Sequence, residues 1–401
     1  MPVRVGIFFT HPIQYFTPLF RRLAAMPEFD VHVHYFSDHS VRGGVDPGFG
    51  VKVAWDVPLL EGYAHTFITR DANMGDSASI RLPDPQRTLR EGRFDVVFVQ
   101  GYARGFERQL VDACAGANVP IVLRAEFTDR RSMDDAGRRG GMLRRMARGV
   151  FLRRFYKNVT RFCVIGKDAR AHLLRHGVPE GKLVWSPYAV DDAALLSSAT
   201  AFDRETCRRE MGIRPEAIVA LFSGKFIPRK DPLTLIDAIA RARGGERLHA
   251  LFVGDGPQMP DVARACEQKL PGRHTLAGFV NQSQLGRYFK AADVFVLPSL
   301  FETWGLVVNE AMHFGLPVVS SDHAGATSDL IDEGRTGWTY PAGSAAALAG
   351  RLEQVVQLGH PGLAAMRPAI AEKIGQYAID RTAAGLKEAF LQAAATRNAR
   401  P

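Results

Sequence analysis

The sequence has 401 residues, of which 46% are hydrophobic, and a formal net charge of +9. This length and apolar content are enough to bury two substantial cores, so two domains are expected. No apolar run reaches the roughly 18 residues that cross a bilayer, which argues against a membrane-spanning chain. The N-terminus runs directly into a strand-like segment, which argues against a secretory signal.

Strand and helix patterns alternate twice along the chain, which predicts the α/β class with two Rossmann-like domains. Most of the expected strands are short, continuous apolar runs, as parallel strands covered on both faces require. In the first half, strands are expected at residues 3–9, 31–36, 51–55, 96–100, 121–125 and 162–165, with helices at 18–25 and 106–115. In the second half, strands are expected at residues 218–223, 250–253, 274–276, 294–297, 317–320 and 337–340.

A polar stretch near residues 188–200 separates the two series, so the expected domains are 1–190 and 200–375, followed by a helical segment at 376–401. The four cysteines are far apart, with no Cys-x-x-Cys pair and no His/Cys cluster at zinc spacing. They are expected to be buried thiols of a cytoplasmic protein.

The positive charge is concentrated between Arg130 and Arg161, where eleven basic residues stand against two acidic ones. Because apolar residues are interleaved with the arginines, the segment suits an anionic membrane surface. The alternative is a helix packed on its own domain with a solvated basic face, and this reading is slightly favoured. Nucleic acid is not an expected partner, since no DNA- or RNA-binding signature accompanies the charge.

Two carboxylates, Glu302 and Glu310, flank the junction between an expected strand and a helix that begins near Leu306. The amides of Thr303, Trp304 and Gly305 then lie at a helix N-terminus, where an anion such as phosphate is favoured. Glu310 could accept two ribose hydroxyls, while Glu302 would stand near the group that the phosphate carries. An ordinary turn with a solvated glutamate is the alternative, and spacing alone gives the two readings even weight.

Three other loops follow expected strands of the second half. The first contains Gly224, Lys225 and Lys230, and its two lysines can both reach one diphosphate and offset the charge of a leaving group. The others are the turn Gly254-Asp255-Gly256 and the segment that carries Phe279 and Val280. A Gly-x-Gly-x-x-Gly fingerprint and a Walker motif are both missing, which disfavours a dehydrogenase and an NTPase.

These motifs together resemble the family-four retaining glycosyltransferases, which have the GT-B fold of two Rossmann-like domains. The resemblance covers PS-x-x-E-x-W-G, N-E-A-M, G-x-PVV-x-S-D, H-A-G and D-E-G-x-T-G-W between residues 298 and 338, together with G-[RK]-x-x-x-x-K at residues 224–230. It implies that Glu302 contacts the transferred sugar, that Glu310 holds the ribose, and that Lys225 and Lys230 bind the diphosphate.

The same resemblance implies further site residues. The backbone from Thr303 to Leu306 would bind sugar and diphosphate, and Phe279 and Val280 would seat the base. Two departures from the family pattern are Lys225, where arginine is commoner, and residues 325–329, Gly-Ala-Thr-Ser-Asp, where the family often has G-G-x-P-E.

In such enzymes the first domain holds the acceptor and the last helix crosses back to brace it. The candidate acceptor residues are His11, Gln14 and Tyr15, which follow the first strand without the family's glycine pair. Glu126 follows another strand where relatives carry a histidine and an aspartate near the sugar, so it is the further catalytic candidate.

The expected reaction is transfer of a hexose from a nucleotide-diphosphate sugar to a hydroxyl of a glycan, a glycolipid or a small molecule, with retained configuration. No Asp-x-Asp motif occurs, so neither a metal nor another cofactor is expected. A sugar-nucleotide epimerase of the same fold and a non-catalytic membrane-docking relative are the alternatives. The expected location is the cytoplasm, with peripheral attachment to the inner face of the membrane if the basic segment binds lipid.

Overall fold

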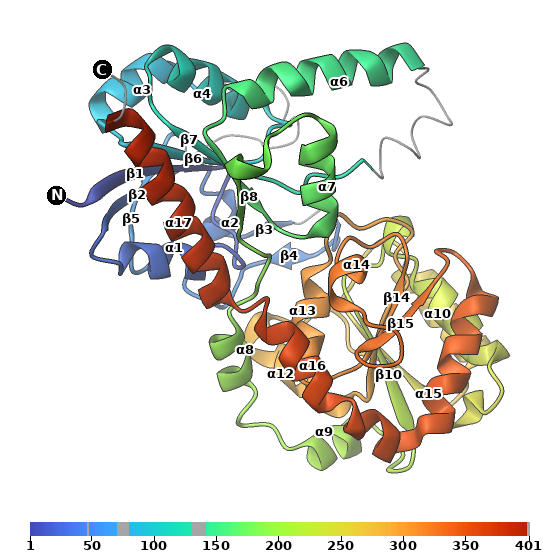
Figure 1. Ribbon diagram of the computed structural model, residues 1–401. Helices are drawn as coiled ribbons and strands as arrows, with labels where there is room; N and C mark the ends of the chain where they lie inside the picture. The colour runs from blue at the N-terminus through green and yellow to red at the C-terminus, as the bar shows by residue number, and fades with distance from the viewer. Residues whose placement is uncertain (46–47, 70–79, 130–141, 399–401) are drawn as a thin grey trace. The chain divides into compact units, whose positions relative to one another are not determined.

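The structure is a computed structural model that describes residues 1–45, 48–69, 80–129 and 142–398 (Figure 1). It divides the chain into two compact units. The first comprises Met1–Gly43, Pro58–Tyr188 and Ile379–Pro401, and the second comprises Gly44–Val57 and Ala189–Ala378. The division differs from the expected contiguous domain 1–190 in one segment, because residues 44–57 pack with the second unit.

The first unit is built on a seven-stranded parallel sheet in the order β5-β2-β1-β6-β7-β8-β9. Its strands are β1 (Val3–Phe9), β2 (Phe29–Tyr35), β5 (Ala64–Phe67), β6 (Val96–Gln100), β7 (Ile121–Arg124), β8 (Arg161–Val164) and β9 (Leu183–Trp185). The interior strand β1 pairs Val5 with Val31 of β2 and with Val96 of β6, and the strand order reverses between β1 and β6. Ligands of such sheets bind at the carboxyl ends of the strands beside this switch point.

Helices cover this sheet, and their apolar faces complete the first core. They are α1 (Thr17–Ala24), α2 (His39–Arg42), α3 (Pro85–Gly92), α4 (Gly105–Gly116), α6 (Met142–Lys157), α7 (Lys167–Arg175) and α17 (Ile379–Asn398), with a 3-10 turn at Glu180–Lys182. The aliphatic side chains of Ile7, Val33 and Leu123 on the sheet are fully buried.

The last helix, α17, is part of the first unit, as the resemblance implied (Figure 1). Its Phe390 ring lies 5.7 Å from the Phe29 ring and 5.8 Å from the Phe98 ring. Gly385 makes the close approach possible, because a Cβ there would lie 2.0 Å from the carbonyl oxygen of Trp185. Helix α17 therefore stabilises a sheet whose strands come from the first half of the sequence.

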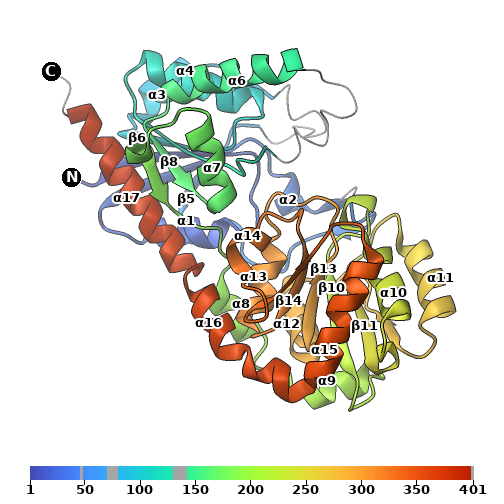
Figure 2. The same ribbon diagram turned by 45° about the vertical axis from the view of Figure 1, so that its right-hand side comes forward.

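The second unit contains a six-stranded parallel sheet in the order β12-β11-β10-β13-β14-β15, with the switch point between β10 and β13. Its strands are β10 (Ile218–Ser223), β11 (Leu248–Val253), β12 (His274–Leu276), β13 (Val294–Leu297), β14 (Val318–Ser321) and β15 (Gly337–Tyr340). Figure 2 shows α10 and α15 alongside the strands of this sheet. The helices are α8 (Asp192–Ser198), α9 (Arg204–Glu210), α10 (Pro232–Arg241), α11 (Met259–Lys269), α12 (Gln282–Ala291), α13 (Leu306–His313), α14 (Thr327–Leu330), α15 (Ala345–Ala365) and α16 (Arg367–Gly375), with 3-10 turns at Pro228–Lys230 and Gly245–Arg247.

The expectation of a buried parallel strand at residues 51–55 is wrong. Only β4 (Lys52–Val53) is extended there, and it pairs antiparallel with β3 (Gly44–Val45). Trp55 packs in an aromatic cluster instead, because its ring lies 6.4 Å from the Phe279 ring in the second unit. The segment is anchored by Asn281, whose side-chain amide donates to the Ala54 carbonyl at 2.7 Å.

The basic segment gives the helix α6, while its part from 130 to 141 lies outside the described residues. Leu152, Phe155 and Tyr156 are buried against the first unit, as the packing alternative requires. Val150 and Phe151 are exposed, with relative exposures of 66% and 44%, and so is Met146. The apolar residues are therefore divided between the core and the surface.

All four cysteines are free and buried. Burial raises the pKa of the Cys114, Cys163 and Cys266 thiols to about 12, so these groups are unreactive core residues. Within the described ranges, no helix combines the length and the apolar character that crossing a bilayer requires.

Candidate functional site

The predicted donor residues lie at the carboxyl ends of the strands that flank the switch point of the second unit. The loop after β10 carries Gly224 to Lys230, and the loop after β13 carries Glu302 to Gly305. The backbone joins the two loops, because the amide of Leu300 donates to the carbonyl of Arg229 at 2.9 Å. This is where an open parallel sheet presents its ligand site.

Glu302 is the centre of a charged cluster. Its Oε2 accepts a hydrogen bond from Lys230 Nζ, and its Oε1 lies 3.6 Å from a guanidinium nitrogen of Arg229. Glu302 is 8% exposed, so both cations are needed to offset the cost of burying its carboxylate. Arg229 was missed by sequence reasoning, although it lies in the same loop motif directly before Lys230.

The junction between β13 and α13 is held by an adjacent segment, residues 323–326. Glu302 forms a parallel bridge with Ala324, and its amide donates to the carbonyl of His323 at 3.1 Å. A Cβ at Gly325 would lie 2.1 Å from the carbonyl oxygen of Thr303, so only glycine fits there. The junction is thus a rigid frame that fixes Glu302.

Helix α13 begins at Leu306 after Gly305, whose φ of 101° is a left-handed value that favours glycine. Trp304 is buried, and its indole donates to Asn309 Oδ1 at 2.9 Å. Glu310 lies inside this helix with 3% of its surface exposed. The tryptophan therefore packs in the core rather than presenting its ring to a ligand, whereas the backbone of Thr303 to Leu306 forms the predicted helix start.

The unusual segment after Gly325 has its own hydrogen bonds. Asp329 is buried and accepts a hydrogen bond from the Tyr377 hydroxyl at 2.9 Å. Burial, and then the charge of Asp329, raise the pKa of Tyr377 far above its ordinary value, so the hydroxyl stays a donor. Asp329 thus ties α14 to the end of the second unit.

The glycine turns at three other strand ends are stacked on one another. The amide of Gly224 donates to the Val253 carbonyl at 2.9 Å, and the amide of Gly254 donates to the Gly278 carbonyl at 2.8 Å. A Cβ at Gly254 would lie only 1.9 Å from the carbonyl oxygen of Gly224. The sequence predicted the glycine turns. In the structure, the loops after β10, β11 and β12 come into backbone contact, which is possible because glycine has no side chain.

An aromatic cluster borders these loops. The Phe49 ring lies 5.1 Å from the Phe279 ring, and Lys225 Nζ lies 4.8 Å from the centre of the Phe49 ring. Sequence reasoning identified Lys225 and Phe279 but did not connect Phe49 and Trp55 with them. No local signal could have made this connection, because Phe49 lies 176 residues before Lys225 and Trp55 lies 224 residues before Phe279, and the contacts arise only through tertiary packing.

In the first unit, the predicted acceptor residues follow β1 at the switch point. Gln14 and Tyr15 lie in the turn before α1. Burial, and then the nearby charges of His39 and Arg104, lower the pKa of His11 to about 3, so this imidazole is neutral at pH 7. Its Nδ1 is enclosed without a hydrogen-bond partner in the described part of the chain. His11 follows β1 and Arg104 follows β6, so the two side chains meet at the carboxyl ends of the strands beside the switch point.

Glu126 follows β7 in the same unit and is exposed. It lies beside Tyr188, whose pKa is raised first by burial and then by the charge of Glu126. The Tyr188 hydroxyl also accepts from Gln100 Nε2 at 3.1 Å, and the guanidinium of Arg124 lies 4.6 Å over its ring. The structure thus places Glu126 in a polar cluster at the carboxyl ends of β6 and β7.

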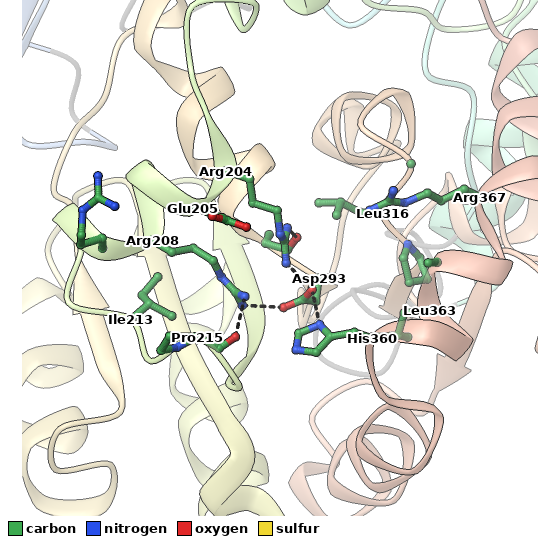
Figure 3. Close-up of a pocket in the computed structure, with 15 residues that line it drawn as sticks. Arg204, Glu205, Arg208, Ile213, Pro215, Asp293, Leu316, His360, Leu363 and Arg367 are labelled. Atoms are coloured by element: carbon green, nitrogen blue, oxygen red, sulfur yellow. Dashed lines mark hydrogen bonds and ion pairs between the residues drawn. The ribbon is translucent and has the colours of Figure 1, made fainter.

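A cavity of about 730 Å³ opens elsewhere in the second unit (Figure 3). Its lining includes the residues directly before β13 and β14, so it lies at the amino ends of these strands. Asp293 at its wall accepts from Arg204 at 2.5 Å, from Arg208 at 2.8 Å and from His360 Nδ1 at 3.0 Å. None of the predicted donor residues lines this cavity, so we do not assign the donor site to it.

The two parallel sheets, with loops that meet at the switch point of the second sheet around the charged cluster at Glu302, define a protein of two Rossmann-like domains. Two family models match the chain. The model described as "Glycosyl transferase 4-like domain" matches residues 12–189, and "Glycosyl transferases group 1" matches residues 203–379. The chain therefore belongs to the group 1 glycosyltransferases, a class of transferase enzymes, and has the GT-B fold.

Curated relatives agree with this family. An uncharacterised glycosyltransferase of Methanocaldococcus jannaschii is 26% identical over 56% of this chain and 59% of its own length. D-inositol 3-phosphate glycosyltransferase 2 of Catenulispora acidiphila is 34% identical over 38% of this chain and 39% of its own length. The chain thus spans between about two fifths and three fifths of these relatives.

Solved structures show the same fold over nearly the whole chain. A glycosyltransferase from Rickettsia africae has a TM-score of 0.71 at 14% identity, with 97% of this chain and 98% of that chain covered. HepE from Anabaena, solved in complex with UDP, has a TM-score of 0.69 at 15% identity, with 97% and 99% covered.

Proposed function

We propose that this protein transfers a hexose from a nucleotide-diphosphate sugar to a hydroxyl acceptor with retained anomeric configuration. The observation that carries the proposal is the cluster of Glu302, Lys230 and Arg229 at the switch point of the second unit. A complex of the structurally similar HepE with UDP-glucose supports this donor class.

The residues of the cluster and of the neighbouring loops would each bind a different part of the donor. Lys230 and Lys225 would bind the two phosphates, and the amides of Thr303 to Leu306 would add the partial positive charge of a helix start. Glu310, which is buried in α13, would accept the ribose hydroxyls, and Glu302 would accept hydroxyls of the transferred sugar. Phe279 and Val280 would border the base.

The proposed reaction needs no covalent intermediate. Both carboxylate oxygens of Glu302 face cations, which lowers their reactivity as nucleophiles. The acceptor hydroxyl would attack the anomeric carbon on the face from which the diphosphate leaves. The bond between this carbon and the phosphate oxygen breaks, and the hydroxyl proton passes to the leaving phosphate. Lys225 and Lys230 would stabilise the charge that develops there, without a divalent metal at this site.

The acceptor would bind to the first unit. Neutral His11 could accept a hydrogen bond from an acceptor hydroxyl, and Gln14 and Tyr15 could position it. Glu126 would be a further polar contact. The acceptor is a glycan, a glycolipid or a small molecule, and a sugar-nucleotide epimerase of the same fold is the rival function.

Replacing Glu302 with Gln tests the proposal. We expect turnover, measured as release of nucleoside diphosphate from a panel of sugar nucleotides and acceptors, to fall about 100-fold or more. Binding of the nucleotide alone should change little. Unchanged turnover would contradict the assignment of Glu302, and conversion of one sugar nucleotide into another without acceptor would favour the epimerase.

The exposed side of α6 favours a second property, peripheral binding to an anionic membrane in the cytoplasm. Exposed Met146, Val150 and Phe151 alternate with arginines on a helix that contains no acidic residue. Replacing Val150 and Phe151 with Ser should abolish sedimentation with anionic vesicles and leave nucleotide affinity unaltered. Unaltered sedimentation would support the alternative, in which α6 only packs on its own unit.

A further inference from the structure

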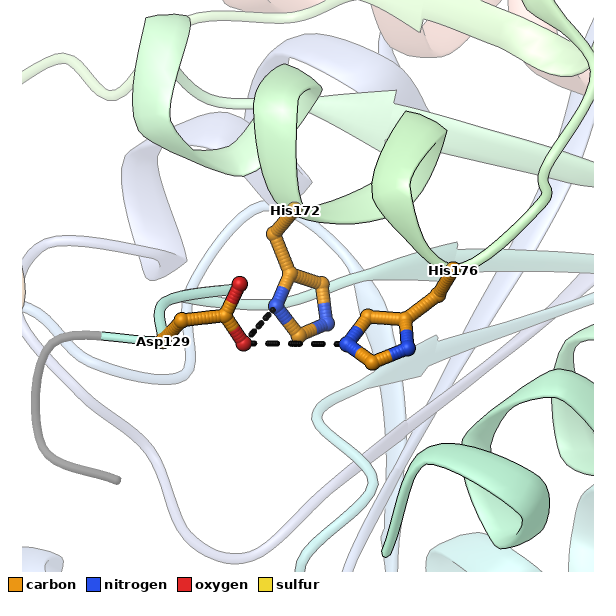
Figure 4. Close-up of side chains that lie close together, drawn as sticks. All are labelled: Asp129, His172 and His176. Carbon is orange, nitrogen blue, oxygen red and sulfur yellow. Dashed lines mark hydrogen bonds and ion pairs between the residues drawn. The ribbon is translucent and has the colours of Figure 1, made fainter. Parts of the chain in front are cut away.

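Three side chains of the first unit converge outside the proposed donor and acceptor residues (Figure 4). His172 and His176 lie four residues apart, near the end of α7, and Asp129 lies in the segment after β7. One ligand atom from each residue lies within 4.8 Å of those of the other two. The residues come from two different elements, so their convergence is a product of the fold.

Two of the three separations between these atoms are close to those in the first coordination sphere of a small divalent ion. Asp129 Oδ1 lies 2.9 Å from His172 Nδ1 and 3.6 Å from His176 Nε2. Ligands about 2.0–2.1 Å from a tetrahedral zinc ion are about 3.3 Å apart. The two observed separations lie on either side of this value, so small rotations of the side chains would admit the ion.

The surroundings provide the outer contacts that such ligands require. The Tyr156 hydroxyl lies 2.9 Å from His172 Nε2, the nitrogen opposite to the one that faces Asp129. Arg175 donates to Asp129 Oδ2, which leaves Oδ1 directed at the histidines. Histidine and carboxylate ligands of metals are commonly oriented by such hydrogen bonds.

Access from solvent is limited but present. The side chains of Asp129 and His176 are 19% and 14% exposed, whereas that of His172 is 1% exposed. An ion can therefore enter at Asp129 and His176 and bind against the enclosed His172. Two imidazoles and one carboxylate favour a transition metal such as zinc over magnesium or calcium, which prefer oxygen ligands.

We propose that Asp129, His172 and His176 bind one divalent transition-metal ion, zinc being the expected one, with water in the remaining position. The ion would join α7 to the segment after β7 and stabilise the first unit. The proposal does not rest on the proposed transferase function, and the ion would take no part in the donor chemistry, whose residues belong to the second unit.

The ion pair of Asp129 with Arg175 is the rival explanation, in which the cluster is only a hydrogen-bonded network. Titration of chelator-treated full-length protein with ZnCl₂ in a calorimeter distinguishes the two. We expect one Zn²⁺ per chain and a rise in the melting temperature, because an ion that binds only the folded state stabilises it. Substitution by Co²⁺ should give the visible absorption of a site with histidine ligands.

His176→Gln is the main test variant, since His176 is partly exposed and its replacement spares the core. Asp129→Asn keeps the shape of the second ligand and removes its charge. Both should weaken Zn²⁺ binding at least tenfold, whereas His65→Gln in the same unit should leave it unchanged. Wild-type protein that binds no Zn²⁺, or variants that bind it as tightly as the wild type, would overturn the proposal. Near-ultraviolet circular dichroism would verify that each variant is folded.

Discussion

Lys230 donates a charged hydrogen bond to Glu302, which joins the loop after β10 to the loop after β13 across the switch point of the second sheet. The side chains are 15% and 11% exposed, so solvent screens this pair far less than a surface ion pair. The proposed phosphate-binding cation is therefore held beside the proposed sugar-binding carboxylate. Loss of Lys230 should therefore affect both phosphate binding and the position of Glu302.

Lys230→Met is expected to reduce turnover about 100-fold or more, because it removes a cation from the position where leaving-group charge develops. It also removes one of the two cations that flank the Glu302 carboxylate and leaves Arg229 beside it. Lys230→Arg restores the charge with a different shape and should recover part of the loss. Release of nucleoside diphosphate under saturating donor measures both variants, and equal activity of Lys230→Met and wild type would contradict the role of Lys230.

Glu310→Ala should have a different signature from Glu302→Gln. A lost hydrogen bond between a ribose and a buried carboxylate costs about 1.5–3 kcal/mol, or about tenfold to 150-fold in nucleotide affinity. The donor KM should rise by a similar factor. Glu372→Gln, at an exposed position of α16, is the control and should leave KM unaltered. A KM for Glu310→Ala that equals the wild-type value would argue against ribose binding.

Gly254→Ala should destabilise the second unit by about 2 kcal/mol or more, since a Cβ would collide with the carbonyl oxygen of Gly224 and φ is 130°. Gly350→Ala is the matched control. Gly350 lies within α15 with open space around it, so alanine there should stabilise the helix by about 0.5–1 kcal/mol. Urea unfolding measures both, and a neutral Gly254→Ala would show that the loops do not meet as described.

The stability of the first unit should decrease with decreasing pH. Burial, and then the neighbouring His32, lower the pKa of His34 to about 3, while in the unfolded chain it returns to about 6.5. Below pH 6.5 the unfolded state therefore binds more protons, and His34 should reduce the free energy of unfolding by about 1.4 kcal/mol per pH unit down to about pH 3.

His34→Leu removes this titration, so the change in the free energy of unfolding between pH 7 and pH 5 should become smaller. Denaturant unfolding at a series of pH values would record the slope for both proteins. Equal slopes would show that His34 takes up no proton on unfolding. His11, whose pKa is also lowered to about 3, should keep part of the dependence in the variant.

The sequence predicted the elements around Glu302 well, because each signal there is local. The apolar run of β13 is bounded by Pro298, and the helical spacing after Gly305 marks α13, so strand and helix starts agree with the structure. The prediction of a buried strand at residues 51–55 was wrong because an apolar run does not by itself specify a sheet. Trp55 instead lies near Phe279 in an aromatic cluster, and the apolar pattern cannot distinguish the two arrangements.

Contacts between residues that are far apart in the sequence could not be predicted from the sequence alone. Phe49 and Lys225 come together only because the segment 44–57 folds onto the second unit. Asp129 and His172 are 43 residues apart, and the sequence analysis identified no cluster of metal-binding residues, so their contact became visible only in the fold. Sequence motifs thus identified residues within single loops, whereas contacts between loops depended on the fold.

The central claim is that the second unit binds a nucleoside diphosphate through Lys225, Lys230 and Glu310. Calorimetric titration of the full-length protein with UDP, GDP and ADP tests it most directly. We predict saturable one-site binding of at least one of the three, weakened about tenfold or more by Lys230→Met and by Glu310→Ala. Absence of binding by all three, or affinities that both substitutions leave unchanged, would contradict the claim.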